Sequence, residues 1–558
     1  MALLRSARYQ RRMRAHRFAV IVIVLVVLGW LAAAGSFWFV CDDAYISFRY
    51  AQHLAQGHGL RFNVDEAPPV EGYSNFLWVL IASAFELVRV PPALGMPVVS
   101  MAAGAAFLLR FWRAAIDRLD MPSWVASLAA AALAFSPGFV VWGTSGLETM
   151  PAAFLLFVVF DAWVLDRDPD AGQRGLWPAV GLSLIRTEGI AWVAVLGALA
   201  LGVRGLERGR RADGARALVW ALVRAFGVYA VYYILRFGYF HTWVSNTAIA
   251  KVDLGWDNLE RGSLYVVGFW LAAATPFAHL LLAPFAIGRA RATGLAIVAM
   301  AFAAPVYSAL IGGDFMTMGR LLVPGLAFGA LCAGLMVAWA DRAWRPLGVA
   351  ASVALIALTA VGTAPLFDTD LAPRKLRKRF EVRLNTEGYK SEYQQWRFMW
   401  GNTKQWLLLG HALHEVETPG DSLVIGAVGA VGYTSDVKIY DQYGIVTPEV
   451  AHRPGKPRHD RSPGHDKFVP VSFFMKDDPT WLWARTYRGG TVRRALTDLD
   501  EFNKPEIRTR YAPHVDVVDV ASSPVFLVTL IESAQPDKDW DEFPSVVQQT
   551  LAGPKSGL

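Results

Sequence analysis

Two adjacent carboxylates, Asp42 and Asp43, follow directly after a long apolar run of the sequence. The run, "FAVIVIVLVVLGWLAAAGSFWFV" (18–40), is long enough to cross a membrane, since the hydrocarbon core requires about 20 apolar helical residues. A carboxylate at the edge of hydrocarbon is costly and typically marks a functional site. The pair is therefore the first candidate for chemistry in this chain.

The residue types allow three roles for the pair. A carboxylate can act as a general base, it can bind a divalent cation, and it can pair with a cation such as Arg49 for a purely structural purpose. The spacing in "DDAYISFRYAQHLAQ" predicts a helix over residues 44–56, with the pair at its N-cap. We expect this helix to lie on the membrane surface and to hold both carboxylates in place.

The composition is that of a polytopic membrane protein. Of the 558 residues 54% are hydrophobic, and apolar runs long enough to cross a bilayer recur through the first two thirds of the chain. The 21 Trp residues are consistent with long membrane–water interfaces. The net charge of +7 comes largely from short basic loops, so we expect a lipid bilayer and no nucleic acid as partner. Cys41 and Cys332 lie in or beside apolar runs and predict no disulfide framework.

The distribution of Lys and Arg predicts the orientation of the chain. The basic N-terminus should be cytoplasmic, and the first helix should remain in place as a start-transfer segment. Alternation between the basic loops gives about eleven transmembrane helices, provided that of the two pieces "FLWVLIASAFELV" (76–88) and "MPVVSMAAGAAFLL" (96–109) one crosses the membrane and the other is a short interfacial or re-entrant piece. The basic loops expected on the cytoplasmic side lie at 110–118, 204–216, 289–292 and 341–345.

The composition changes near residue 370, where apolar runs become short and turn residues frequent. We expect a transmembrane domain at 1–369 and a soluble, extracytoplasmic α/β domain at 370–558. The basic run "RKLRKR" (374–379) argues weakly against an external tail, but long domains can be translocated despite local charge. "GAVGAVG" (426–432) has glycines three apart, which is not the spacing of a dinucleotide-binding turn.

Four short stretches of the tail have the residue pattern of strands. A long amphipathic stretch, "SEYQQWRFMWGNTKQWLLLGHALHEV", predicts a helix. The predicted strands are "DSLVIGA", "VKIYD", "HVDVVDV" and "PVFLVTLIES".

The predicted topology brings further polar residues to the outer face. A lipid phosphate at this depth would require cations such as Arg186, Lys251 or Arg320. Each of these residues by itself is explained as well by a helix cap, an ion pair or a side chain that extends to the interface. The other polar residues of this face, which could contact a substrate, are Glu71, Tyr73, Asn75, Glu148, Glu188, His241, Asn246 and Asp314.

A series of motifs, taken in order, resembles a bacterial branch of the GT-C glycosyltransferases. This branch includes the terminal arabinofuranosyltransferases of mycobacterial cell-wall polysaccharides. No single motif is specific to the branch, but the ordered series is. The motifs are "DDAYISFRYAQHLAQGHGLRFN", "VEGYSNFLW", "SGLET", "RTEGI", "SNTAIAK", "GGDFMTMGRLLVP" and "GAVGYTSDVKIYDQYGIVTPEVAHR", with "GHDK" further on.

The resemblance implies a GT-C-like enzyme of the bacterial inner membrane with a polyprenyl-phosphate sugar as donor. Asp42 and Asp43 would be the catalytic pair at the outer face. Lys251 and Arg320 would hold the donor phosphate, with Arg186 and Arg49 as further candidates. The soluble tail would help to bind or position a glycan acceptor. A divalent cation is the one cofactor left open.

The simplest reaction is a single displacement. One carboxylate would take the proton of an acceptor hydroxyl while the other orients it, and general-base help is worth about 10²–10⁴ in rate. A single displacement inverts the anomeric centre, whereas the mycobacterial relatives are described as retaining. A nucleophilic carboxylate and an oxocarbenium-like ion pair therefore stay open.

The sequence leaves open both the sugar that is transferred and the class of protein. Arabinofuranose is favoured by the resemblance, while a hexose such as mannose or an amino-pentose stays open. A transporter or flippase for lipid-linked sugars would carry charges at the membrane midplane and broken helices in paired halves. A non-catalytic scaffold would not need the pair. The gathering of ionisable residues at one face favours the enzyme.

Overall fold

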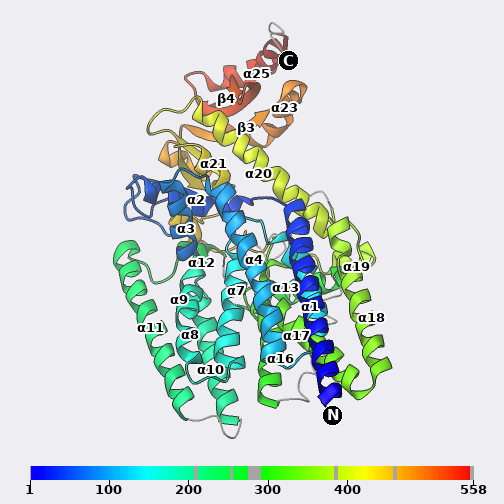
Figure 1. The fold of residues 1–558 in the computed structure, drawn as a ribbon. Coiled ribbons are helices and arrows are strands. Elements are labelled where there is room, and N and C mark those ends of the chain that lie inside the picture. Colours follow the sequence, from blue (N-terminus) through cyan, green and yellow to red (C-terminus); the bar gives the residue numbers. More distant parts are fainter. Residues whose placement is uncertain are drawn as a thin grey trace.

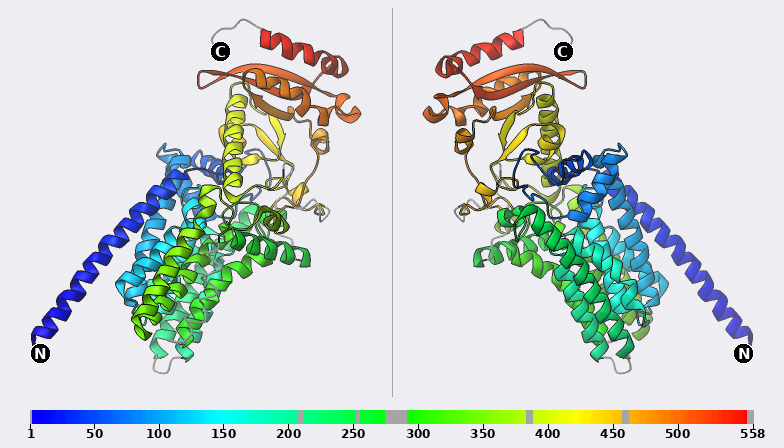
Figure 2. Two further views of the ribbon diagram at one scale, coloured as in Figure 1. Left: turned by 90° about the vertical axis from the view of Figure 1, so that its right-hand side faces the viewer. Right: turned by 90° about the vertical axis from the view of Figure 1, so that its left-hand side faces the viewer.

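The computed structural model describes residues 2–206, 212–251, 255–273, 291–382, 388–456 and 462–552. Its helices form a bundle that carries a smaller mixed domain at one end (Figure 1). The N-terminus lies at the opposite end of the bundle, and the C-terminal helix lies at the far tip of the mixed domain (Figures 1 and 2). The N-terminus and the tail are thus at opposite ends of the bundle.

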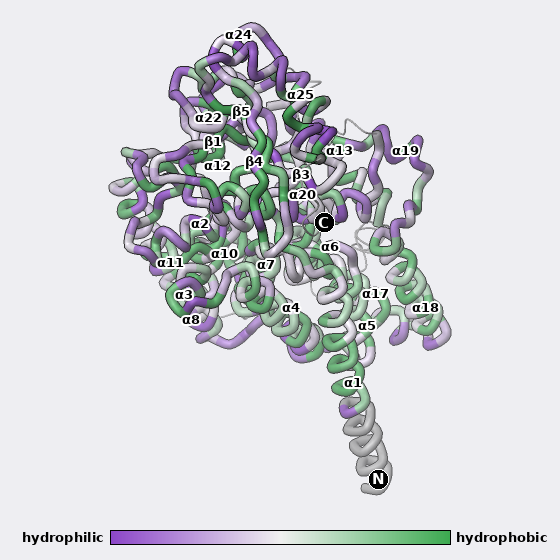
Figure 3. Tube along the Cα trace, turned by 90° about the horizontal axis from the view of Figure 1, so that it is seen from above, coloured by the Kyte–Doolittle hydropathy of each residue, from purple (hydrophilic) through white to green (hydrophobic). Residues whose placement is uncertain are grey.

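Seven of the described helices are long and apolar enough to cross a membrane, which makes the chain a multi-pass membrane protein. In the helix that starts at Arg320, 89% of the residues of an apolar 18-residue stretch are buried inside the bundle. The corresponding share is 17% in the helix that starts at Gly214. Apolar residues dominate these helices (Figure 3). They are α1 (Ala2–Ser36), α4 (Pro92–Asp117), α10 (Gly189–Leu206), α11 (Ala212–Phe240), α16 (Arg291–Leu310), α17 (Val323–Ala343) and α18 (Arg345–Gly362).

Shorter or broken helices follow the predicted order of the other crossings. They are α5 (Ser123–Ala134) with α6 (Pro137–Val141), α7 (Thr149–Phe160) with the π-helical turn Asp161–Leu165, and α8 (Ala171–Arg174) with α9 (Leu176–Ile185). The crossing expected at 264–288 begins in α13 (Trp256–Ala272) and then leaves the described residues. The sequence left open which of the pieces at 76–88 and 96–109 is short, and the structure answers this, because α3 (Phe76–Leu87) has only 12 residues whereas α4 has 26.

α2 (Asp42–Ala55) crosses the end of the bundle beneath the mixed domain (Figure 1). It packs against α3 and against α21 (Val428–Thr434), and nine of its residues are buried, among them Tyr45, Phe48 and Tyr50. Protein therefore covers several faces of α2, and the helix is held by these contacts.

The mixed domain contains a five-stranded sheet in the order β2-β1-β3-β5-β4. β1 pairs in parallel with β2 and β3, while β5 pairs antiparallel with β3 and β4. β3 was not among the predicted strands, because its apolar residues do not alternate. The strands are β1 (Ser422–Ile425), β2 (Lys438–Asp441), β3 (Trp481–Tyr487), β4 (Tyr511–Val520) and β5 (Ser523–Glu532).

α20 (Glu392–His414) connects the bundle to the sheet (Figure 1). It starts with a capping box between Ser391 and Gln394, which satisfies backbone donors at both positions. At the bundle, the Glu392 carboxylate accepts hydrogen bonds from the Thr317 hydroxyl at 2.7 Å and the Met318 backbone N–H at 2.6 Å. The longer helix α25 (Pro536–Ala552) packs on β4. The smaller helices are α12 (Asn246–Lys251), α19 (Arg374–Arg379), α22 (Pro448–Ala451), α23 (Arg494–Asp498) and α24 (Pro505–Arg508).

Candidate active site

Asp43 lies in the first turn of α2 and faces a cavity between the bundle and the mixed domain. Its Oδ2 accepts a hydrogen bond from Lys251 Nζ at 2.9 Å. Burial alone would raise the pKa of Asp43, but the charges of Lys251 and, to a smaller extent, Arg320 hold this pKa below its usual value. Asp43 is therefore an ionised carboxylate that can accept a proton.

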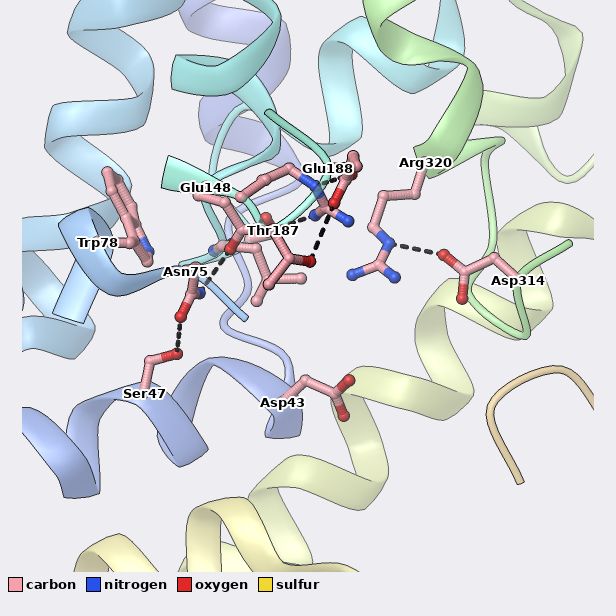
Figure 4. A network of polar contacts seen from close by, with 12 residues as sticks. Asp43, Ser47, Asn75, Trp78, Glu148, Thr187, Glu188, Asp314 and Arg320 are labelled. Atoms are coloured by element: carbon pink, nitrogen blue, oxygen red, sulfur yellow. Dashed lines mark hydrogen bonds and ion pairs between the residues drawn. The ribbon is translucent and has the colours of Figure 1, made fainter. Parts of the chain in front are cut away.

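This cavity, the central cavity, has a volume of about 970 Å³. It brings together nine of the predicted site residues from six separate stretches of sequence. Figure 4 shows Asp43 projecting from α2 toward the group that contains Glu148, Glu188 and Arg320. The nine residues are Asp43, Tyr73, Asn75, Glu148, Arg186, Glu188, Lys251, Asp314 and Arg320.

A chain of hydrogen bonds fixes one wall of the central cavity (Figure 4). The Asn75 side chain accepts from the Ser47 hydroxyl at 3.0 Å and donates to Glu148 Oε2 at 2.7 Å. Arg186, at the end of α9, bridges Glu148 and Glu188. Two carboxylates around one guanidinium leave this group with a net charge of about −1 and hold Arg186 in one orientation.

Arg320 is positioned by the glycine-rich loop before α17. Gly313 has a φ of +79°, and a Cβ there would lie 2.7 Å from the Tyr265 side chain, so the loop turns where a larger residue would not fit. The turn lets Asp314 Oδ2 accept a hydrogen bond from Arg320 Nε at 2.6 Å. Both terminal nitrogens of Arg320 point away from Asp314, and the structure describes no hydrogen bond for them (Figure 4). They are available to an anionic ligand.

Asp42 points toward the mixed domain instead. Its carboxylate accepts hydrogen bonds from the backbone N–H groups of Ala430 at 2.7 Å and Gly429 at 3.3 Å, both in the first turn of α21. Burial raises the pKa of Asp42 to about 7. The predicted N-cap role is wrong, because Cys41 occupies the N-cap position of α2 and no side chain caps this helix. The two neighbouring carboxylates thus have different environments.

Arg49 is not brought to the central cavity. Its buried guanidinium donates to three backbone carbonyls, those of Phe62 at 2.7 Å, Gly432 at 2.6 Å and Val437 at 2.8 Å. These bonds use all three of its nitrogens and tie α2 to the mixed domain, so Arg49 has a structural environment where a donor-binding role was predicted.

Three other predicted candidates also lie outside the central cavity. Glu71 forms a buried ion pair with Arg236 of α11. The Asn246 amide donates to the backbone carbonyls of Gly444 at 2.7 Å and Ile445 at 2.8 Å. His241 is exposed directly after α11. None of the three lines the central cavity in the described structure.

Several residues at this site were not among the predicted candidates. Tyr307 of α16 lines the central cavity. The His465 ring lies between those of Phe315 and Tyr443, with centroids 4.5 Å and 4.9 Å away. Its neighbour Asp466 pairs with Arg261 of α13, and the "GHDK" motif was the available signal for both.

An apolar pocket continues from the central cavity into the bundle. It shares Arg186, Glu188, Tyr307 and Arg320 with the central cavity. Its deeper lining is hydrocarbon, from Ala152, Leu156, Leu182, Trp192 and Pro324. A ligand with a charged head and an apolar tail fits this combination of surfaces.

A second and larger cavity, the interdomain cavity, has a volume of about 2100 Å³. It lies between α20, the carboxyl ends of β1 and β2, and the start of α2. Both Asp42 and Asp43 line it, so Asp43 stands where the two cavities meet. Ligands commonly bind at the carboxyl ends of parallel strands.

The described residues offer one group of three potential metal ligands, His414, Glu417 and Asp436. This group lies at the end of α20 and contains neither Asp42 nor Asp43. Among the described residues, no third His, Cys, Asp or Glu lies close enough to Asp42 and Asp43 to form a group of three potential metal ligands with them.

Comparison with known proteins identifies the fold. Residues 387–538 match a domain of unknown function, DUF8728. The chain is 26% identical over 359 residues to a terminal β-(1→2)-arabinofuranosyltransferase of Corynebacterium glutamicum, covering 56% of this chain and 51% of that protein. The chain thus spans about half the length of this curated relative.

Solved structures of ArnT from Cupriavidus metallidurans are similar over nearly the whole chain. The structure bound to undecaprenyl phosphate has a TM-score of 0.54 at 14% identity and covers 92% of this chain and 98% of ArnT. The apo structure has a TM-score of 0.49 at 13% identity with the same coverage. The expected GT-C-like helical fold with a small C-terminal sheet is confirmed.

Proposed function

We propose that this chain, which has the ArnT-like GT-C fold, is a membrane glycosyltransferase that moves a sugar from a polyprenyl-phosphate donor to a cell-envelope glycan. The observation that carries the proposal is the position of Asp43. It contacts Lys251 and shares one cavity with Arg186 and Arg320, and that cavity continues into an apolar pocket.

The donor fits these surfaces by its chemistry. The phosphate would contact Arg320, Arg186 and Lys251, because guanidinium and ammonium groups form strong charge-assisted hydrogen bonds with phosphate oxygens. The polyprenyl chain would enter the apolar pocket beside Leu156 and Trp192. The name of the solved ArnT complex with undecaprenyl phosphate supports a donor of this class.

Asp43 would act on the acceptor hydroxyl as the sugar leaves the phosphate. It is ionised, and it lines both cavities. The cations would stabilise the charge that builds on the leaving phosphate, and loss of one preorganised donor of this kind costs roughly 3–4 kcal/mol. A donor phosphate would also draw Lys251 away from Asp43 and thereby raise the basicity of the carboxylate at the moment of binding.

We assign arabinofuranose as the sugar, with support from the name of the corynebacterial relative. We further assign residues 1–369 to the transmembrane catalytic domain and 370–558 to an extracytoplasmic domain that helps to bind the glycan acceptor. The N-terminus would then be cytoplasmic, in a bacterial inner membrane.

The test is transfer of labelled sugar from a synthetic polyprenyl-phosphate arabinofuranose by the purified full-length protein. Arg320→Ala and Arg186→Ala should each lower kcat by about 10²–10³. Arg342→Ala is the matched control, because Arg342 lies at the other end of α17 and donates to the Asp120 carbonyl. Near-normal rates in both cavity variants would contradict the assignment.

Two further measurements complete the test. A flippase would move the donor across liposomes without consuming it, so release of polyprenyl phosphate distinguishes the two functions. Mass spectrometry of the envelope glycan with and without the gene identifies the sugar, and the loss of a hexose instead of a pentose would overturn the arabinofuranose assignment.

A further inference from the structure

We infer that the interdomain cavity is an elongated groove for an uncharged oligosaccharide, and that the acceptor is held over several sugar units. This inference rests on the proposed function for the identity of the ligand as acceptor. The groove itself is argued from the side chains that line it.

One face of α20 forms the long wall of the groove. Residues from Gln395 to Leu409 line it at intervals of three and four, which is the spacing of a single helix face. The 14 residues between these positions rise about 21 Å at 1.5 Å per residue. A wall of this length is several times longer than one sugar ring. The lining residues of α20 are Gln395, Phe398, Met399, Asn402, Thr403, Gln405, Trp406 and Leu409.

Aromatic side chains from both walls give the groove apolar planes. Trp406 belongs to α20, Trp483 to β3, and Tyr443 follows β2. A sugar ring has an apolar C–H face that packs well against a flat indole or phenol ring, while the polar edge of the aromatic group stays hydrated. Planes on two walls suit a chain of sugar rings that passes between them.

Amide groups stand between these planes. Gln395 is only 9% exposed, and Asn402 lies about two turns further along the same face. The structure describes no protein hydrogen bond for either amide. An amide can both donate and accept, as a sugar hydroxyl does, so the two groups are suited to read hydroxyls. A buried amide without a protein partner is costly unless a ligand or water satisfies it.

The cations of the groove are engaged by other groups, which favours an uncharged ligand. Arg485 pairs with Asp498 at 2.9 Å. The Lys456 ammonium lies over the rings of Phe468 and Tyr443, 4.8 Å and 5.2 Å from their centroids. Burial, with the nearby charge of Lys251, lowers the pKa of His465 and favours its neutral form. A phosphorylated acceptor would need cations that are not already engaged.

The inference is tested by binding, without donor, in the full-length protein. A linear pentofuranose hexasaccharide should bind at least about tenfold more tightly than the monosaccharide, a difference of about 1.4 kcal/mol, measured by calorimetry in micelles. Trp406→Ala should remove most of this gain and leave the weak monosaccharide binding unchanged. Trp400→Ala is the matched control, because Trp400 lies on the same helix but stacks on Trp396 outside the groove.

Asn402→Ala and Trp406→Phe provide variants that disturb packing less, should Trp406→Ala fold poorly. Asn402→Ala should weaken hexasaccharide binding relative to wild type. Trp406→Phe should retain part of the affinity that Trp406→Ala loses. Equal affinity for the monosaccharide and the hexasaccharide would contradict the proposal that the groove binds several sugar units.

Failure of the proposed function has a different signature. If no sugar is transferred but binding still depends on chain length, the groove stands and the transferase assignment falls. If sugar is transferred with a KM that does not depend on acceptor length, the transferase assignment stands and the groove falls. An anionic oligosaccharide that binds more tightly than the neutral one would also contradict the inference.

Discussion

Lys251 Nζ and Asp43 Oδ2 meet at 2.9 Å although 208 residues separate them in the chain. One lies at the end of α12 and the other at the start of α2. The contact holds the cation and the carboxylate together on the wall of the central cavity.

Replacing Asp43 by Asn should lower the transfer rate by about 10²–10⁴, since the amide cannot take a proton from the acceptor. The measurement is single-turnover transfer of labelled sugar by purified protein. Asp65→Asn is the control, because Asp65 is exposed in the loop after α2. A variant that keeps more than half of the wild-type rate would remove Asp43 from the reaction.

Lys251→Met should move the acid limb of the kcat/KM profile to higher pH. The ammonium now favours the ionised form of Asp43, and a neighbouring cation lowers a carboxyl pKa by about 1–3 units. Loss of the cation should shift the limb upward by a comparable amount, in addition to the lower rate. Lys404→Met, on the exposed face of α20, should leave the limb in place. An unchanged limb in Lys251→Met would show that another group controls it.

Asp42→Asn should change the pH dependence of stability more than it changes the chemistry. The pKa of Asp42 is raised to about 7 in the folded protein, above its unfolded value near 4. Between these values the folded state holds a proton that the unfolded state has lost, so wild-type stability falls as pH rises. Asn does not titrate and should lack this component, which thermal unfolding of both proteins from pH 4 to 8 measures. Parallel curves would contradict the raised pKa.

Arg236→Met should destabilise the fold by about 3–5 kcal/mol, because it leaves Glu71 buried and unpaired. The double variant with Glu71→Met removes both charges and should recover most of that loss. Thermal unfolding and the yield of monodisperse protein report the difference. A double variant no more stable than the single one would show that Arg236 acts through its bonds to the loop after α11 instead.

The sequence was sufficient to predict most of the central cavity because its residues follow the ends of membrane helices. Periodicity and basic loops assign Glu148, Arg186 and Asp314 to one end of the bundle, and helices of a bundle bring such ends together. Arg49 was misjudged for a physical reason. An arginine after a membrane span is equally suited to a phosphate or to backbone carbonyls, and its carbonyl partners lie up to 388 residues away.

The glycines of "GAVGAVG" show where local pattern reaches its limit. Their spacing excluded a dinucleotide turn but did not indicate their purpose. A Cβ at Gly429 would lie 2.0 Å from the Asp42 carbonyl oxygen, and one at Gly432 would lie 2.7 Å from Arg49 Nη1. The two glycines share a face of α21 and allow it to approach α2 closely. The contact depends on a partner far along the chain, so no local signal could specify it.

The ion pair between Arg261 and Asp466 has a consequence for how the protein is made. It is a two-bond contact, at 2.7 Å and 2.9 Å, that joins α13 to the segment beside His465. The ribosome completes every membrane helix before it reaches Asp466, and before it reaches the backbone donors that bind Asp42. Until the tail is synthesised, Asp42 and Arg261 therefore lack these hydrogen-bond partners. The central cavity is therefore completed last, when the tail has folded back onto the bundle.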